Sequence, residues 1–166
     1  MIPGPDRRTL LTASLFGVAA AMPLPALAVE SSTRFDRAAY DRYIALMNAG
    51  DVRFVDYYAG DIRFVMNIRG RAAVLDFYAR QRPYVKERLD VSFFCSDSTG
   101  AAAEVRSEVR CIRDCADTTI FGRPLKAGEV QTIRGCLLYA LDAQGLIAEI
   151  KGPPPEILQP WRLVAR

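Results

Sequence analysis

The 166-residue chain contains no histidine, and this limits the chemistry open to it. Without imidazole, Ser-His-Asp and Cys-His nucleophilic sites and most zinc sites are excluded. Any catalysis has to use carboxyl, phenol, amine or thiol groups. The candidate chemistry is therefore proton transfer by acidic residues and tyrosines, and the question is which of them the fold brings together.

Tyrosines are spread over the predicted helices and strands. They are Tyr40, Tyr43, Tyr58, Tyr78 and Tyr139. One interpretation is core packing, with each hydroxyl at the boundary with water. The other is a pocket in which Tyr43, Tyr58 and Tyr139 orient an apolar ligand through one or two hydrogen bonds. The predicted pocket residues are Tyr40, Tyr43, Tyr58, Phe64, Met66, Leu137 and Tyr139, and Phe64, Met66 and Leu137 form its apolar wall.

Four cysteines follow the first third of the chain: Cys95, Cys111, Cys115 and Cys136. In an extended segment Cys111 and Cys115 would lie about 13 Å apart, beyond disulfide reach, so a bridge between them needs a turn directly after Cys111. Without a histidine partner, neither a metal site nor another cofactor is expected. The simplest expectation is four small, buried or half-buried side chains with one bridge at most.

The formal net charge is +3, with acidic and basic residues interspersed. A nucleic-acid-binding protein is expected to have a basic stripe or block, and this sequence has none. The basic run from Arg80 to Arg88 resembles a cluster for an anion, and a solvated surface after a helix end explains it as well. No nucleic-acid partner is therefore predicted.

Residues 1–28 have the order of an export signal: Arg7 and Arg8, an apolar run from Leu10 to Met22, and small residues before a cut after Ala28. The arginine pair resembles the twin-arginine motif, and the ordinary secretory route is the alternative. The apolar run is short for a bilayer core of about 30 Å, so no stable membrane span is expected after cleavage. We predict a protein exported to the bacterial periplasm, with residues 29–34 as a linker.

Three helices are expected next. Tyr40, Tyr43, Ile44 and Met47 recur at helical spacing. Ser32 or Thr33 is expected to cap this helix, which stops at Gly50. Asp51 then starts a second helix that reaches about Tyr58. A third helix follows Gly70, with a buried stripe of Ala73, Val74, Phe77 and Tyr78.

The rest of the domain is predicted to be strands. After Gly60 the period becomes two, with Ile62, Phe64, Met66 and Ile68 on one side of a strand. From Leu89 to Lys151 the alternation is typical of an antiparallel sheet with one wet face. A single domain is expected over 35–152, followed by a proline-rich tail over 153–166 in which Trp161 covers a sheet edge.

The segments "YIALMNAGD", "YYAGDIRF", "IRGRAAVLDFY" and "YALDAQGLIAEI" stand in an order similar to the nuclear-transport-factor-two-like superfamily. Within it, the chain most resembles SnoaL-like and ketosteroid-isomerase-like domains, over roughly residues 35–151. The resemblance implies an α+β fold, in which three N-terminal helices wrap a curved antiparallel (mixed) sheet into a cone around a mainly apolar cavity. Such domains include isomerases, cyclases, dehydratases and non-enzymatic binders, and they commonly pair through the outer sheet, so a homodimer is one option.

Ketosteroid isomerases use a carboxylate base and an oxyanion hole of a tyrosine and a protonated aspartic acid. The resemblance places Tyr43 at the tyrosine's position, but the base position falls on Met66 and the second acid on Leu137. Neither side chain exchanges a proton. This departure argues against ketosteroid-isomerase chemistry by that pair.

Three functions are compatible with the sequence. The leading hypothesis is an exported protein that holds a small apolar molecule without catalysis. The second is an isomerase, cyclase or dehydratase acting on an apolar carbonyl compound, with Tyr43 and Asp61 as candidate catalytic residues. The third is a non-catalytic interaction domain, which predicts an apolar patch on the outer sheet and no usable cavity.

Overall fold

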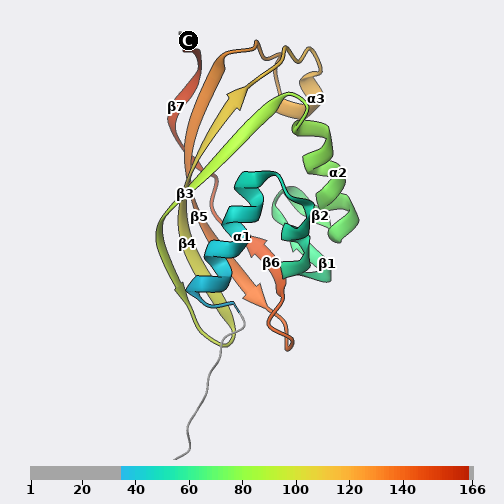
Figure 1. Cartoon of the computed structure of the whole chain (residues 1–166), viewed down its shortest axis with the longest axis vertical. Coiled ribbons are helices and arrows are strands. Elements are labelled where there is room, and N and C mark those ends of the chain that lie inside the picture. Colours follow the sequence, from blue (N-terminus) through green and yellow to red (C-terminus); the bar gives the residue numbers. More distant parts are fainter. Residues whose placement is uncertain (1–34, 165–166) are drawn as a thin grey trace, which may run out of the picture. The chain divides into compact units, whose positions relative to one another are not determined.

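A curved sheet of seven strands is the main element of the computed structural model, which describes residues 35–164 (Figure 1). The strands are β1 (Tyr58–Phe64), β2 (Ile68–Arg69), β3 (Val85–Ser96), β4 (Gly100–Cys111), β5 (Glu129–Leu141), β6 (Ile147–Lys151) and β7 (Glu156–Leu163). Their order is β2-β1-β6-β5-β4-β3, and β7 pairs with β5. The β1–β6 pair is parallel and the others are antiparallel. The predicted α+β class with a curved, mixed sheet is confirmed.

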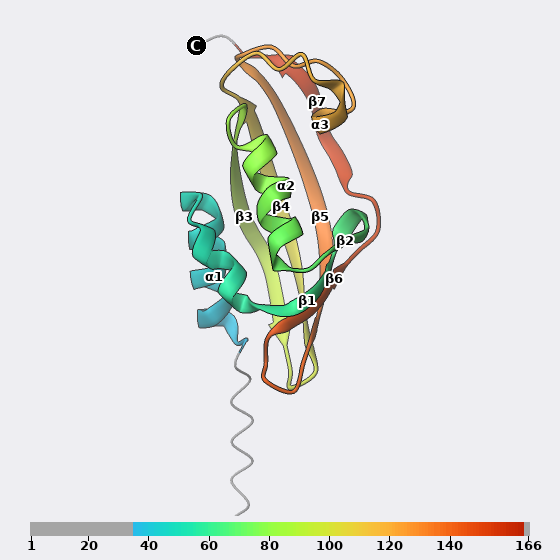
Figure 2. The same ribbon diagram turned by 90° about the vertical axis from the view of Figure 1, so that its right-hand side faces the viewer.

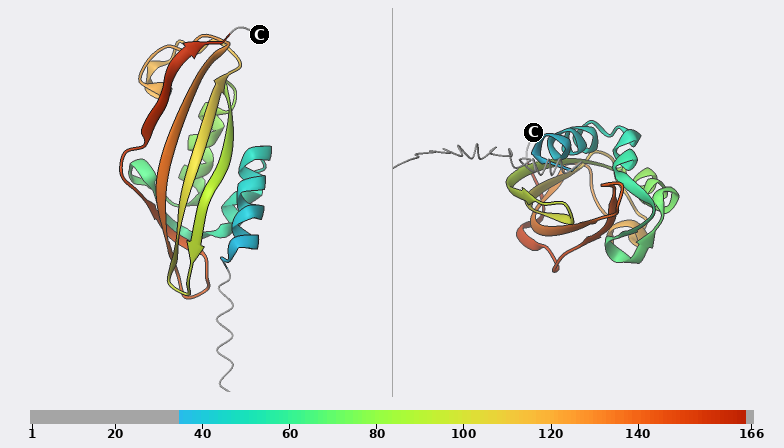
Figure 3. Two further views of the ribbon diagram at one scale, coloured as in Figure 1. Left: turned by 90° about the vertical axis from the view of Figure 1, so that its left-hand side faces the viewer. Right: turned by 90° about the horizontal axis from the view of Figure 1, so that it is seen from below.

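Helices cover one face of this sheet (Figure 2). They are α1 (Arg37–Ala49), the 3-10 helix η1 (Val52–Tyr57), α2 (Arg71–Gln81) and the short α3 (Thr118–Phe121). The opposite face is turned to the viewer in the left view of Figure 3, with α2 behind it and α1 beside its β3 edge. The three predicted N-terminal helices are present in the predicted order, and the second is a 3-10 helix. The pattern did not predict α3.

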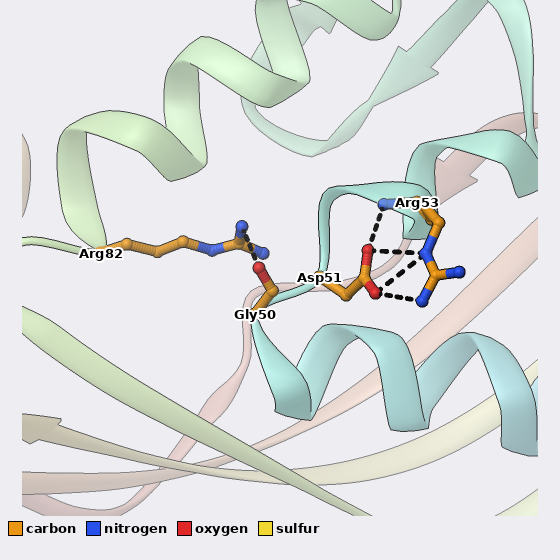
Figure 4. A network of polar contacts seen from close by, with 4 residues as sticks. All are labelled: Gly50, Asp51, Arg53 and Arg82. Carbon is orange, nitrogen blue, oxygen red and sulfur yellow. Dashed lines mark hydrogen bonds and ion pairs between the residues drawn. The ribbon is translucent and has the colours of Figure 1, made fainter.

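The corner between α1 and η1 is built as the sequence predicted. Gly50 ends α1 with φ 70°, a left-handed conformation that glycine adopts without strain. The Asp51 carboxylate then accepts a hydrogen bond from the backbone N–H of Arg53 at 2.9 Å. Arg82, just after α2, donates to the Gly50 carbonyl at 2.8 Å and ties the two helical segments together (Figure 4). The start of α1 differs from the prediction, because Asp36 caps it rather than Ser32 or Thr33, which lie outside the described residues.

The strand after Gly60 is shorter than the period-two pattern predicted. β1 ends at Phe64, and a tight turn at Met66 and Asn67 leads into β2, which pairs back on β1. Met66 therefore lies at a hairpin tip and not on the apolar side of a strand. The apolar alternation of the sequence runs through the turn, but its last two members have different positions. Met66 lies at the hairpin tip, and Ile68 lies in the returning strand β2.

Residues 156–163 form β7 and not an irregular tail. β7 pairs with β5 from Glu129 to Arg134, and β6 pairs with β5 from Leu138 to Leu141. The same edge of β5 thus passes from one partner to the other, and the segment from Gly152 to Pro155 bridges the interval. Trp161 lies in β7 and packs edge-on against Phe121, with ring centroids 6.4 Å apart.

Aromatic side chains fill one end of the space between the sheet and α1. Phe35, Tyr40, Phe94 and Tyr139 pack together, and Tyr40 stacks on Phe94 with ring centroids 4.4 Å apart. Beneath them, β4 offers only the small side chains of Ala101 and Ala103. A second core cluster of Val85, Cys111, Cys115 and Leu125 lies under the loop that joins β4 to β5. Between these two packed regions the sheet is left partly uncovered.

Candidate functional site

A cavity of about 570 Å³ lies between the two packed regions, bounded by the inner face of the sheet, α1 and α2. Its floor holds Val105 on β4 opposite Gly135 on β5, and nothing lies within 4 Å of where a Gly135 side chain would begin. A strand residue without a side chain leaves a hollow that its neighbours do not fill. Gly135, in the inward-facing row of β5, thus adds open space to the floor of the cavity.

Most of the wall is apolar. The contributing side chains come from α1, the β1–β2 hairpin, α2, the sheet and the β6–β7 link. They include Ile44, Met47, Phe64, Val65, Phe77, Leu89, Ile133, Leu137 and Ile150. A cavity of this size and lining suits a small, mainly apolar molecule that a few polar groups orient.

One carboxyl group reaches this apolar wall, and it belongs to Glu87 on β3. Val85, Glu87 and Leu89 alternate onto the inner face, so the strand itself directs Glu87 inward. Ser107 on β4 donates its hydroxyl hydrogen to a Glu87 carboxyl oxygen at 2.5 Å. Ser107 faces Leu89 in the strand register, which makes Glu87 its diagonal neighbour. The pair gives the cavity one fixed proton-exchanging group.

Burial raises the pKa of Glu87 above its ordinary value near 4.5, because the apolar surroundings penalise the charged carboxylate. The hydrogen bond from Ser107 and the positive charge of Arg82 act in the opposite direction, and burial is the larger effect. A carboxyl group with a raised pKa is suited to general acid–base work near neutral pH.

Two tyrosine pairs surround the same space. The Tyr43 and Tyr58 hydroxyls are 2.8 Å apart, and those of Tyr40 and Tyr139 are 3.1 Å apart. Tyr43 and Tyr139 line the cavity, while Tyr40 and Tyr58 are buried behind them. Burial raises the pKa of Tyr43 far above its usual value, so its phenol stays protonated and acts as a hydrogen-bond donor.

Tyr78 on α2 completes the polar side of the cavity. Burial raises its pKa well above the usual value, and the negative charge of Glu87 raises it further. The Arg82 guanidinium lies 5.3 Å from the centre of the Tyr78 ring, a cation–π distance. The Tyr78 phenol therefore remains protonated beside the Glu87 carboxyl, which places a donor and a proton acceptor in one wall.

Glu87 also borders a second recess of about 690 Å³ outside this wall. Met47, Tyr78, Gln81 and Glu87 are common to the linings of both hollows. The second recess is lined by charged side chains that include Arg82, Lys86, Arg88 and Asp90. Glu87 thus stands between an apolar cavity and a charged surface, where a proton can be exchanged with water.

The structure places the predicted pocket residues in two groups. Tyr43, Phe64, Met66, Leu137 and Tyr139 line the cavity. Tyr40 and Tyr58 do not, and each instead holds the hydroxyl of a lining tyrosine. Tyr58 therefore lies behind the cavity wall and not in its lining. The apolar wall of Phe64, Met66 and Leu137 is present, with Met66 at its exposed rim.

The structure contradicts the proposed pairing of Tyr43 with Asp61. Asp61 is exposed on β1, and its neighbour Ile62 is buried, as is Phe64 two residues further on. Because side chains alternate along a strand, a residue next to an inward one faces the other way. Asp61 borders a separate recess with Arg63 and Arg69 and is not a catalytic candidate.

Sequence reasoning missed Glu87 because it assigned residues 80–88 to a solvated surface and started the strand at Leu89. The strand begins at Val85, four residues earlier. The signal was present, since Val85, Glu87, Leu89 and Val91 continue the period of two with one acidic residue among apolar ones. An acidic residue on the apolar side of a strand is a candidate site residue. Ser107 on β4 and Gly135 on β5 likewise interrupt the apolar side of their strands, one with a hydroxyl group and one with no side chain.

All four cysteines are thiols in the structure, with Cys111 and Cys115 buried and Cys95 and Cys136 exposed. Over residues 35–164, no group of three or more cysteine or acidic side chains is arranged to hold a metal ion. Nor does any helix in that range have the length and apolar character needed to cross a membrane.

The sequence pattern of the SnoaL-like domain matches residues 40–150. No curated protein matches the chain.

Solved structures support the same fold. Two proteins with ascribed polyketide cyclase activity are similar. The one from Xanthomonas campestris pv. campestris has a TM-score of 0.57 and 22% identity, and the match covers 69% of this chain and 85% of that one. The one from Pseudomonas putida KT2440 has a TM-score of 0.58 and 23% identity, and the match covers 69% of this chain and 87% of that one. The Δ5-3-ketosteroid isomerase of a Mycobacterium species is also similar (0.54, 23%, 70% and 90%).

Proposed function

The chain belongs to the SnoaL-like domain family, within the nuclear-transport-factor-two-like superfamily, and from this premise we propose that it binds a small, mainly apolar carbonyl compound and moves a proton on it. The observation that carries the proposal is the Glu87 carboxyl in an otherwise apolar cavity, held by Ser107 at 2.5 Å. Isomerisation, cyclisation and dehydration of such compounds can each begin with a proton transfer of this kind.

In the proposed step, the Glu87 carboxylate takes a proton from the carbon next to the substrate carbonyl. The electron pair of that C–H bond moves into the carbonyl group, which becomes an enolate. A tyrosine phenol, Tyr78 or Tyr43, donates a hydrogen bond to the enolate oxygen, in surroundings of low polarity where such a bond is strong. Glu87 then returns the proton to a carbon of the substrate. The enolate electron pair forms the new C–H bond, and the carbonyl group is restored.

This proposal replaces the leading hypothesis from the sequence, in which the pocket lacked proton-transfer groups. Met66 and Leu137 indeed carry none, but the carboxyl enters from β3, which that comparison did not consider. Binding without turnover remains the second candidate. It is favoured by the tyrosine pairs, since the hydroxyls of Tyr43 and Tyr139 already bond to other tyrosines.

The test has two stages with the purified chain. Native mass spectrometry and thermal shifts with a panel of cyclic ketones and enones identify ligands, and proton NMR in D2O follows exchange of the protons next to the carbonyl. Glu87→Gln should retain binding and lose at least about 100-fold in exchange rate, because it removes the general base. Equal exchange by the two proteins would refute the catalytic proposal, and absence of binding would refute both candidates.

We also propose a homodimer through the outer sheet. Phe93 and Leu138 are 54% and 48% exposed there, beside the exposed thiols of Cys95 and Cys136. Apolar groups on an outer sheet face favour association with a second such face. Light scattering should give twice the chain mass for the wild type and the monomer mass for Leu138→Lys, and a monomeric wild type would contradict the pairing.

Export to the periplasm is likewise a proposal, because residues 1–34 lie outside the described residues. It is supported by the arginine pair and the Ala-Leu-Ala sequence before residue 29. N-terminal sequencing of protein from the periplasmic fraction should begin at Val29. Recovery of the uncut chain from the cytoplasm alone would contradict it.

A further inference from the structure

The rim of the cavity exposes apolar groups to solvent. We define the apolar rim as Met66, Pro153, Pro154, Pro155 and Ile157. Met66 and the three prolines line the cavity from two sides, and the β1–β2 hairpin and the β6–β7 link lie next to each other in Figure 2. Met66 and Ile157 are 66% and 59% exposed, and Ile157 pairs with Ile133 of the cavity wall. The apolar surface therefore continues from the cavity to the outside.

The conformation of Met66 is unfavourable for its residue type. Its φ of 59° and ψ of 27° are left-handed, as is the φ of 62° at Asn67. Left-handed positions in hairpin turns favour asparagine and glycine, and a residue with a long side chain is uncommon there. The strain brings little burial in return, because two-thirds of Met66 is exposed. Methionine is a flexible apolar residue that adapts to irregular contacts, which suits a contact outside this chain.

Basic side chains flank the same hairpin. Met66 shares a recess with Arg63, Arg69, Lys151 and Glu149. Glu149 pairs with both Arg63 and Lys151, at 3.3 and 3.6 Å, while Arg69 makes no ion pair within residues 35–164. Three cations and one carboxylate leave this recess with a charge of +2, which Asp61 in the next recess partly offsets. An exposed apolar tip beside a cationic patch is complementary to an anionic lipid surface.

We propose that the apolar rim docks on an anionic lipid bilayer, so that an apolar substrate passes between the membrane and the cavity without crossing water. The identity of the substrate class rests on the proposed function, whereas the docking surface is inferred from the exposed apolar rim and the charges beside it. Met66 and Ile157 enter the headgroup region, and Arg69 contacts the lipid phosphates. The substrate class is thereby narrowed to carbonyl compounds that partition into lipid.

Hydrogen exchange of the full chain, read by mass spectrometry, tests the docking peptide by peptide. Vesicles of phosphatidylcholine with about 30% phosphatidylglycerol should protect the amides of residues 65–69, 151–152 and 156–158, and phosphatidylcholine alone should protect them less. Because exchange is localised, any contact that residues 1–34 make with the vesicles is read separately.

Variants sharpen the test. Met66→Asn suits the left-handed turn and removes the apolar tip, so it should fold and lose most of the rim protection. Arg69→Gln lies outside the cavity lining and should weaken vesicle binding about fivefold, the effect of one basic side chain near an anionic surface. The matched control is Val52→Asn, which removes another exposed apolar side chain (56%, against 66% for Met66) on η1 and should bind vesicles as the wild type does.

Unchanged exchange at the rim, or an equal loss with Val52→Asn, would overturn the docking proposal. Protection of the rim that grows with protein concentration in the absence of vesicles would also overturn it, in favour of a second copy of the chain. The proposed function fails separately: rim protection with no ketone exchange refutes catalysis and leaves docking standing. Exchange of the ketone protons without protection of the rim refutes docking and leaves the catalytic proposal standing.

Discussion

Replacing Glu87 with glutamine should change how the stability of the protein depends on pH. The amide has nearly the same shape as the carboxyl, and its oxygen still accepts the hydrogen bond from Ser107, so packing is retained. What the substitution removes is a carboxyl group whose pKa burial raises above its ordinary value near 4.5.

The sign and the size of the effect follow from linkage. Above its ordinary pKa, the unfolded chain releases the Glu87 proton while the folded protein still holds it, so rising pH favours unfolding of the wild type. The slope for one proton is at most about 1.4 kcal/mol per pH unit. Once the pH passes the pKa of Glu87 in the folded protein, this group causes no further loss of stability as the pH rises. Glutamine does not titrate, so the variant gains stability relative to the wild type across this window.

The assay is urea unfolding of the two proteins between about pH 4 and pH 8, followed by the fluorescence of Trp161, the single tryptophan. All other carboxyl groups are common to both proteins and cancel in the difference between their unfolding free energies. That difference should be smallest near pH 4 and rise with pH in favour of Glu87→Gln. A pH-independent difference, or one that moves in favour of the wild type as pH rises, would refute the assignment of Glu87 to a desolvated wall.

Two further predictions concern the hollow and the sheet edge. Gly135→Leu should cut ligand affinity at least about tenfold and leave stability equal or up to about 1 kcal/mol higher, because it fills the cavity and replaces a strand glycine. Isothermal titration should show Gly135→Ala binding much better, and equal binding by both would contradict this location. Asn48→Ala should lower the free energy of unfolding by about 1–2 kcal/mol, because the Asn48 amide makes two hydrogen bonds to the backbone of Leu89 on the edge of β3. Urea unfolding measures the loss, and no change would show that this edge contact is not stabilising.

The regular features of the fold were predictable from short-range patterns. Tyr40, Tyr43 and Ile44 repeat at helical spacing and are buried, and Gly50 stops the helix with the expected left-handed backbone. From Glu104 to Cys111, β4 alternates between charged residues and uncharged ones. In each case the period of the sequence reports directly on which face is buried.

The misassigned regions are those where distant parts of the chain decide the outcome. β7 contains Pro160 and follows three prolines, yet it pairs with the edge of β5 that β6 leaves unpaired. Met66 continued an apolar alternation, but the chain reverses there to form a hairpin. The spacing of apolar residues within a short segment indicates neither the unpaired edge of β5 nor the chain reversal at Met66.

The candidate site was found only in part for a related reason. The tyrosines and the apolar wall follow from burial patterns, so Tyr43, Phe64 and Leu137 were predictable. Glu87 was not assigned, because a charged residue near a basic run is usually solvated. Its inward direction depends on where β3 begins, and strand boundaries are the least certain feature of a sequence pattern.

The most direct test of the central claim is a carbon-13 NMR titration of the Glu87 carboxyl, with and without a cyclic ketone that native mass spectrometry shows to bind. The resonance is assigned by its loss in Glu87→Gln. A ligand in the cavity should raise the Glu87 pKa further, because it displaces water from the carboxyl and so penalises the charged carboxylate more strongly. Binding that leaves this titration unchanged would contradict the claim that Glu87 and the ligand share one pocket.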